Sequence, residues 1–120
     1  MALNLLWNKC DGGKWCKLLE LNLEDQHFDD MKGVYIIWHA GENSATVRVG
    51  QGFIRERLAA HKEEPEILEY RPYTLYVTWA QVATNQCDGV ECYLAGKLNP
   101  KVGSRFPDTE PIEVNSPWQE

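Results

Sequence analysis

The fold of this chain is decided by residues 33–52, which read GVYIIWHAGENSATVRVGQG. The run from Val34 to Trp38 is rich in β-branched and aromatic side chains, which favours a strand buried on both faces. The polar residues 41–44 have the composition of a hairpin turn. A second strand, Ala45 to Val49, ends at Gly50-Gln51-Gly52, and a helix pattern follows directly. The segment therefore predicts a β-hairpin that leads into a helix.

The next part of the chain predicts two helices and a third strand. Residues 53–64 are helix formers that run uninterrupted up to Pro65, which should end or bend the helix. Residues 74–80 alternate apolar and polar side chains with strong β formers, as a strand does. A second long helix opens at Asp88 and closes at Asn99-Pro100, because proline restricts the residue before it. We therefore expect an α+β fold with a small, mostly antiparallel three-stranded central sheet flanked by helices.

The two ends of the chain give less regular patterns. Residues 1–32 are expected to form an N-terminal extension packed on a core domain of residues 33–120, with a single domain overall. Within the extension, Leu19, Leu21 and Leu23 alternate and could form an edge strand or a connector. Residues 111–115 could be a short final strand that ends at Asn115.

Length and composition limit the class of protein. A chain of 120 residues has room for one core, and 43% hydrophobic residues is close to the globular average. No apolar run approaches a membrane span, and the N-terminus lacks a signal-peptide pattern. We therefore expect a cytoplasmic protein with no membrane partner. The net charge of -6 argues against broad electrostatic attraction to nucleic acid. It is compatible with a small basic patch that binds a single phosphate.

The four cysteines have spacings that differ from those of common zinc sites. Cys10 and Cys16 form a C-x5-C pair and Cys87 and Cys92 a C-x4-C pair, whereas zinc sites use tighter C-x2-C pairs. A composite four-cysteine site that stabilises an interaction domain remains an alternative. We expect reduced thiols, since disulfides are rare in the cytoplasm, and no structural zinc.

Two tripeptides at corresponding ends of the hairpin resemble the signature of the GIY-YIG nuclease superfamily. They are Gly33-Val34-Tyr35 and Arg48-Val49-Gly50. Arg48 stands where members of the family usually carry a tyrosine. The resemblance extends over roughly residues 33–103, because the features that follow the hairpin come in the family's order.

Three later residues complete this resemblance. Family members follow the hairpin with a helix that bears an arginine, often a histidine or tyrosine one turn later, and then a glutamate on a later helix. Arg57 matches the arginine and His61 the residue one turn on, since i and i+4 share a helix face. Glu91, in the helix that opens at Asp88, matches the glutamate.

The resemblance implies a divalent-metal-dependent endonuclease that hydrolyses phosphodiester bonds in DNA. Glu91 would be a ligand of one Mg²⁺ or Mn²⁺, because a carboxylate with open positions suits ions that keep water and bind phosphate oxygens. Arg57 would hold a phosphate through two parallel hydrogen bonds. Tyr35 would act as general base or orient the water, and a phenol with a pKa of about 10 needs a metal or cation nearby to do so. His61 would assist proton transfer or hold the phosphate.

Four further residues are expected to contact the substrate. Arg48, Gly50 and Gln51 follow the second signature position, and Arg48 could bind phosphate in place of the missing tyrosine. The family commonly has an asparagine shortly after the proline that follows the glutamate helix. This chain has Gly103 there, and Asn115 is the candidate for that role. A partner protein, the shape of the substrate or oligomerisation would supply specificity.

Each catalytic candidate also has a structural interpretation. Tyr35 could be a core residue with a satisfied hydroxyl, and Arg57 could be a solvated helix arginine. His61 is favoured near a helix C-terminus by the helix dipole. Asp88-x-x-Glu91 has the pattern of a capping box, with Asp88 at the N-cap and Glu91 at N3. Only the joint order of the four candidates favours catalysis.

A second function also fits the departures from the family pattern. Arg48, Gly103 and the negative net charge favour a catalytically impaired GIY-YIG scaffold that acts as a nucleic-acid or protein binding module.

Overall fold

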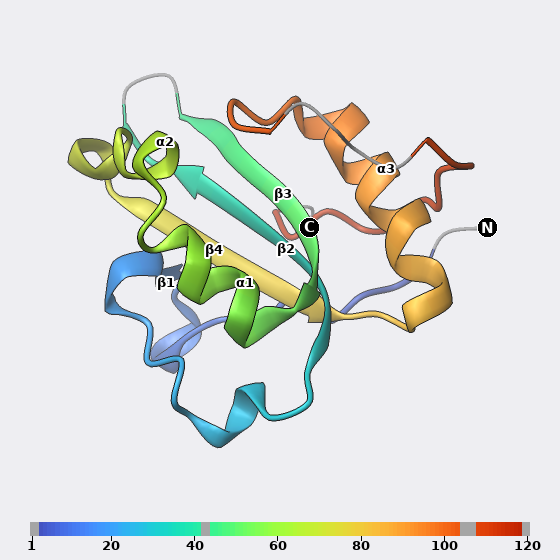
Figure 1. Cartoon of the computed structure of the whole chain (residues 1–120), viewed down its shortest axis with the longest axis horizontal. Helices are drawn as coiled ribbons and strands as arrows, with labels where there is room; N and C mark the ends of the chain where they lie inside the picture. Colours follow the sequence, from blue (N-terminus) through green and yellow to red (C-terminus); the bar gives the residue numbers. More distant parts are fainter. Residues whose placement is uncertain (1–2, 42–43, 104–107, 119–120) are drawn as a thin grey trace.

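A four-stranded antiparallel sheet forms the centre of the computed structural model, which describes residues 3–41, 44–103 and 108–118 (Figure 1). The strand order is β1-β4-β2-β3, with β1 at Cys16–Lys17, β2 at Lys32–His39, β3 at Ala45–Phe53 and β4 at Leu75–Gln81. The predicted α+β class is confirmed. The three expected strands are β2, β3 and β4, and β1 is an additional edge strand that pairs with β4. A strand of two residues has too little alternation to be recognised in the sequence.

The predicted hairpin is formed by β2 and β3. Their register runs from Lys32↔Phe53 to His39↔Ala45, with an irregularity between Ile37 and Trp38. The strand β3 does not end at Val49 as expected, since it continues through the glycines to Phe53. β2 also pairs with β4 along its length, so it is the central strand, whereas β3 is an edge.

Three α-helices accompany the sheet in the described residues. They are α1 at Ile54–His61, α2 at Pro65–Leu68 and α3 at Cys87–Leu98, and short 3-10 turns lie at 11–13, 18–20, 26–28, 71–73 and 84–86. α3 ends at Asn99, which is in the left-handed conformation (φ 47) that commonly closes a helix. None of the described helices has the length and apolar character that a membrane crossing requires.

The predicted capping box at the start of α3 is wrong. The helix begins at Cys87, so Gln86 is the N-cap and Asp88 lies inside the first turn. Gln86 makes no side-chain capping hydrogen bond, and Glu91 is the fifth helical residue instead of the third. A capping role therefore does not explain the glutamate at this position.

The two faces of the sheet pack against different helices, as the positions of α1 and α3 in Figure 1 illustrate. Alternation along β2 decides which residue faces which helix, although almost every residue of the strand is buried. The core on the α1 face includes Tyr35, Ile37, Val47, Ile54, Leu58 and Val77. The core on the α3 face includes Trp7, Val34, Ile36, Val49, Val90 and Leu94.

The N-terminal segment joins both the sheet and the C-terminal segment. Leu3 forms an isolated parallel bridge with Val114, and the expected final strand over residues 111–115 is reduced to this bridge. Of the two alternatives for Leu19, Leu21 and Leu23, the structure has a connector and not an edge strand, because residues 18–20 form a 3-10 turn and no strand follows at 21–23. That turn buries Leu18 completely and leaves Leu19 42% exposed.

The expectation of four reduced thiols is wrong for the N-terminal pair. Cys10 and Cys16 form a disulfide across a separation of six residues. A turn at residues 11–13, with Gly12 and Gly13 at positive φ, brings the two cysteines together. Cys87 and Cys92 carry free thiols on α3.

Candidate functional site

A chain of two hydrogen bonds connects β2 to the turn after α1. The Oη atom of Tyr35 lies 2.5 Å from Nε2 of His61, and Nδ1 of the same imidazole lies 2.6 Å from Oε2 of Glu64. Tyr35 is fully buried and His61 is 3% exposed, whereas Glu64 is partly open to solvent. The sequence predicted the first two residues as site residues and missed Glu64.

The hydrogen-bond partners of His61 fix the form of its ring. Because the carboxylate of Glu64 accepts a hydrogen bond from Nδ1–H, the neutral imidazole presents Nε2 as an acceptor to the hydroxyl of Tyr35. Burial lowers the pKa of His61 below its ordinary 6.5, and the hydrogen bond and charge of Glu64 oppose that shift. The imidazole is therefore uncharged near neutral pH and can accept a proton.

Gly50 lies against the tyrosine ring from the neighbouring strand. It pairs with Tyr35 across β2 and β3. A Cβ atom added at Gly50 would stand 2.8 Å from Cε2 of Tyr35 and closer still to its hydroxyl oxygen. Real Cβ atoms do not approach so closely, so the glycine is needed for packing and has no side chain to offer a substrate.

Two arginines flank the tyrosine hydroxyl. Arg48 on β3 is half-buried, and Arg57 on α1 is exposed. Burial raises the pKa of Tyr35 above its ordinary 10.0. Arg57, and after it Arg48, oppose the shift through hydrogen bonding and positive charge. Both guanidinium groups therefore lie where they would stabilise a phenolate.

Arg48 also has an unused hydrogen-bond donor. Its Nε atom is buried and finds no acceptor among the described residues. Buried polar groups in folded proteins nearly always have a partner, so this donor calls for an acceptor from an ordered water or a ligand. An anionic oxygen suits the guanidinium group.

Glu91 approaches the same edge of the sheet from α3. Its side chain is 7% exposed, and burial raises the pKa of its carboxyl above the ordinary 4.5. A hydrogen bond from Gln51 and the charge of Arg48 oppose this shift. Gln51 also donates a hydrogen bond to Asp88, one turn before Glu91. Because side chains alternate along β3, Arg48 points toward Tyr35 on one face of the sheet and Gln51 toward α3 on the other.

The structure does not bring Asn115 into this group. Its side-chain oxygen accepts a hydrogen bond from the backbone N–H of Leu5 at 2.6 Å, and its side-chain nitrogen donates to the carbonyl of Leu5 at 3.0 Å. The amide thus joins the two terminal segments at both of its ends. Residues 104–107, after Gly103, lie outside the described residues.

The carboxylates fit an open magnesium or manganese site better than a closed metal cage. Asp88 and Glu91 lie one turn apart on α3. Within the described ranges, no group of three or more His, Cys, Asp or Glu residues could hold a metal ion. Mg²⁺ is commonly bound by one or two carboxylates together with water and substrate phosphates, and Asp88 and Glu91 are two carboxylates of the kind that it uses.

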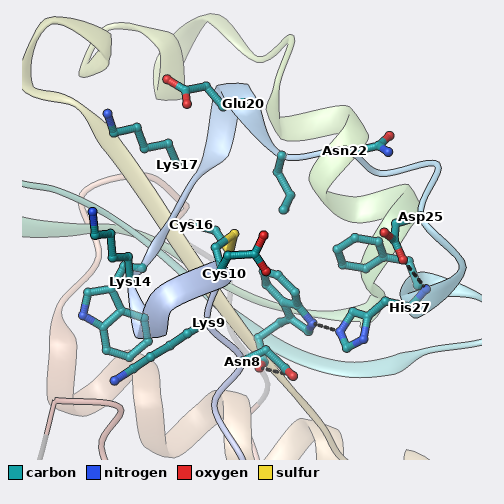
Figure 2. A pocket seen from close by; sticks show the side chains of 15 residues that line it. Asn8, Lys9, Cys10, Lys14, Cys16, Lys17, Glu20, Asn22, Asp25 and His27 are labelled. Atoms are coloured by element: carbon teal, nitrogen blue, oxygen red, sulfur yellow. Dashed lines mark hydrogen bonds between the residues drawn. A yellow bond between two sulfur atoms is a disulfide. The ribbon is translucent and has the colours of Figure 1, made fainter.

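A separate cavity of about 640 Å³ lies beside β4 (Figure 2). It contains the disulfide and several charged side chains of both signs, which are Lys9, Asp11, Lys14, Lys17, Glu20 and Asp25. His27 accepts a hydrogen bond at Nε2 from the indole of Trp79 at 3.0 Å. No predicted site residue lines this cavity, and its balanced charges indicate no particular ligand.

Comparisons of this chain with protein-family models, with curated proteins and with solved structures gave no match. Its function is therefore inferred from the residues of the site.

Proposed function

We propose that this chain is a divalent-metal-dependent endonuclease of the GIY-YIG type that hydrolyses phosphodiester bonds in DNA. The observation that carries the proposal is the hydrogen-bonded chain from Tyr35 through His61 to Glu64. It provides a phenol with a proton acceptor held in the correct tautomer, which is the arrangement that general-base catalysis requires. Arg48 and Arg57 lie beside this hydroxyl, and their positive charges also act on the buried Glu91 on the α3 face of the sheet.

In the resting site the proton stays on Tyr35. The ordinary pKa values of the phenol and the imidazole, 10.0 and 6.5, differ by 10.0 − 6.5 = 3.5 units. This difference corresponds to about 5 kcal/mol against proton transfer, and the burial of both groups adds to it. The positive charges of Arg48 and Arg57 offset the cost for the phenolate, and the carboxylate of Glu64 offsets it for the imidazolium.

The hydrolytic step then follows from these positions. The hydroxyl proton of Tyr35 passes to Nε2 of His61, and the phenolate takes a proton from the attacking water. The water oxygen forms a bond to phosphorus, and the bond from phosphorus to the leaving oxygen breaks. The leaving oxygen keeps that electron pair and takes a proton from solvent, and the imidazolium of His61 releases its proton to solvent, which restores the neutral ring. Arg48, with its free buried Nε, and Arg57 hold the phosphoryl oxygens.

Substrate binding would also uncover the tyrosine. Tyr35 has no exposed surface, and Arg57 is an exposed, flexible side chain next to its hydroxyl. A phosphate that draws the guanidinium of Arg57 toward itself would open a path for water to the phenol. The same movement would replace solvent around Arg57 with the anion that it neutralises.

Glu91, with Asp88 beside it, would hold the divalent ion. When bound, the ion neutralises charge on the phosphate and lowers the pKa of coordinated water. Burial raises the pKa of Glu91, so at a given pH a larger fraction of this carboxyl is protonated than of an ordinary glutamate. Metal binding must displace that proton. Affinity for the metal should therefore fall as the solution is acidified.

The test is cleavage of supercoiled plasmid and of branched DNA with Mn²⁺ or Mg²⁺ against EDTA. We expect metal-dependent nicking that is lost in Glu91→Ala and in Tyr35→Phe. The matched control is Glu63→Ala, which removes an exposed carboxylate from the turn after α1. Equal cleavage by Glu91→Ala and the parent would contradict the proposal. Binding of DNA without cleavage of any substrate would favour the second function, a catalytically impaired scaffold that uses Arg48 as an anion contact.

A further inference from the structure

A second cavity, of about 670 Å³, lies where the start of β3 meets the end of α3. Its size is in the range of small-ligand sites, about 300–1,000 Å³, and suits one nucleotide. The side chains that decide its chemistry are Trp38, Thr46, Lys97, Leu98, Lys101 and Trp118. None of them takes part in the proposed catalytic group.

The charge of this cavity is opposite to that of the whole chain. Lys97 and Lys101 are the charged side chains among its described lining residues, whereas the chain carries a net charge of -6. The backbone N–H of Lys101 donates to the carbonyl of Thr46 at 3.0 Å, which fixes this residue beside β3. The C-terminal end of α3 carries a partial negative charge of about half an elementary charge. The two lysines carry more positive charge than this end of the helix carries negative charge. The cavity therefore favours an anion.

Two tryptophans give the cavity an aromatic wall. Trp38 stacks on Tyr76, with ring centroids 5.7 Å apart, and this contact holds its ring in place. Trp118 packs edge-on against Trp38 at 5.1 Å and keeps 39% of its surface exposed. Exposed aromatic rings beside lysines are the combination that binds single-stranded nucleic acid, because the base stacks and the backbone is neutralised.

The cavity and Glu91 of the proposed catalytic group lie along the same junction of β3 and α3. Leu98 lines the cavity and is seven residues after Glu91, which places both on one helix face about 10 Å apart along the axis. Thr46 lines the cavity and is two residues from Arg48 on β3. One short stretch of a nucleic-acid strand could therefore contact both places.

We propose that this cavity binds an unpaired stretch of the DNA strand that is cut. One base stacks on Trp118 beside Trp38, and the phosphates next to it bind Lys97 and Lys101. The inference rests on the proposed nuclease function and specifies its substrate as DNA with single-stranded character near the cleaved bond. An unstacked base enters the cavity, whereas a paired base within a duplex keeps its stacking neighbours and is excluded.

The experiment measures binding separately from cleavage. A fluorescein-labelled single-stranded oligonucleotide of 12 nucleotides is titrated with protein in EDTA and followed by fluorescence anisotropy, with the same sequence as a duplex for comparison. Trp118→Ala should weaken binding roughly 5- to 150-fold, the effect of removing one stacking aromatic side chain. Trp118→Phe should keep most of the affinity, because phenylalanine still offers a ring.

The lysines are tested by salt dependence. Removal of two phosphate contacts in Lys97→Ala/Lys101→Ala should reduce the slope of log affinity against log salt concentration by about 1.4 for a single strand. The control Lys14→Ala/Lys17→Ala removes two exposed lysines at the other cavity and should leave the slope unchanged. Circular dichroism of every variant verifies folding.

The outcomes separate the two proposals. Absence of binding by the parent, a preference for the duplex, or equal affinity and salt slope in the Trp118 and lysine variants would overturn the inference. If the strand binds at this cavity and the parent never cuts with Mn²⁺, the nuclease proposal fails and the binding surface remains. If the parent cuts and Trp118→Ala binds and cuts equally well, only the binding surface is refuted.

Discussion

Replacement of Gly50 by alanine tests the packing that positions the hydroxyl of Tyr35. The added Cβ atom would lie 2.8 Å from Cε2 of the ring and nearer to Cζ and the hydroxyl oxygen. Both residues are fixed by the pairing of β2 with β3, and Tyr35 has no exposed side on which to move. Either the ring or the strand must shift.

The two energetic effects of this substitution have opposite signs. Overpacking of a core costs typically about 1–3 kcal/mol, and a contact this short belongs at the upper end. Alanine in a strand gains about 0.5–1 kcal/mol over glycine, because the unfolded chain loses conformational freedom. The difference between the overpacking cost and this gain leads us to expect that Gly50→Ala lowers the free energy of unfolding by about 2 kcal/mol.

The assay is urea unfolding followed by circular dichroism, in a double-mutant cycle with Tyr35→Leu. Without the ring, the cost of Gly50→Ala should largely disappear. The matched control is Gly96→Ala in α3, where an added Cβ meets nothing within 4 Å. It should stabilise the protein by about 0.5–1 kcal/mol. An unchanged stability of Gly50→Ala, or an equal cost in the leucine background, would refute the proposed contact.

Four further results are expected. Glu91→Gln should abolish metal-dependent cleavage and raise the melting temperature at neutral pH. Burial raises the pKa of the Glu91 carboxyl, so the folded state favours its protonated form. The resulting stabilisation of the fold is complete below pH 4.5 and is lost as the pH rises through the raised pKa. Because burial lowers the pKa of His61, acidification through 6.5 should destabilise the parent, and His61→Gln should flatten that part of a stability-pH curve from urea unfolding. Glu64→Gln should slow cleavage roughly 100-fold, since the imidazolium loses its counter-charge, with DNA affinity by anisotropy unchanged. Replacing both Cys10 and Cys16 by serine should cost about 2 kcal/mol in urea unfolding, as expected for a loop closed across six residues.

Local patterns in the sequence were sufficient to predict the elements that carry Tyr35 and His61. The hairpin is encoded by β-branched and aromatic runs on either side of a polar turn, and α1 by helix formers directly after it. The structure brings Tyr35 and His61 into contact, as one would expect of a shared site. Their roles in catalysis remain predictions.

Glu64 could not be selected from the sequence. It follows Glu63, and the two residues are equivalent in a list of acidic side chains. Only the end of α1 at His61 and the turn toward Pro65 direct one of them back to the imidazole. That turn depends on the packing of Ile67 in the core, which no local pattern reports.

Contacts between distant parts of the chain explain the other differences. Asn115 was predicted as a substrate contact because it follows a possible strand, but its partner Leu5 lies 110 residues away. β1 exists only through its pairing with Val77 and Tyr76 on β4. Such pairings depend on the whole fold, so short patterns cannot specify them.

The joining of the two terminal segments has a consequence for the order in which the protein folds during synthesis. Trp7 and Val114 belong to the same core, although more than a hundred residues separate them in the chain. The indole of Trp7 also donates to the carbonyl of Asn115 at 2.9 Å. The layer beneath α3 therefore cannot close until Val114 has left the ribosome. Among the described residues, the core beneath α1 extends only to Val102, so a nascent chain should protect Tyr35 from solvent before it protects Trp7.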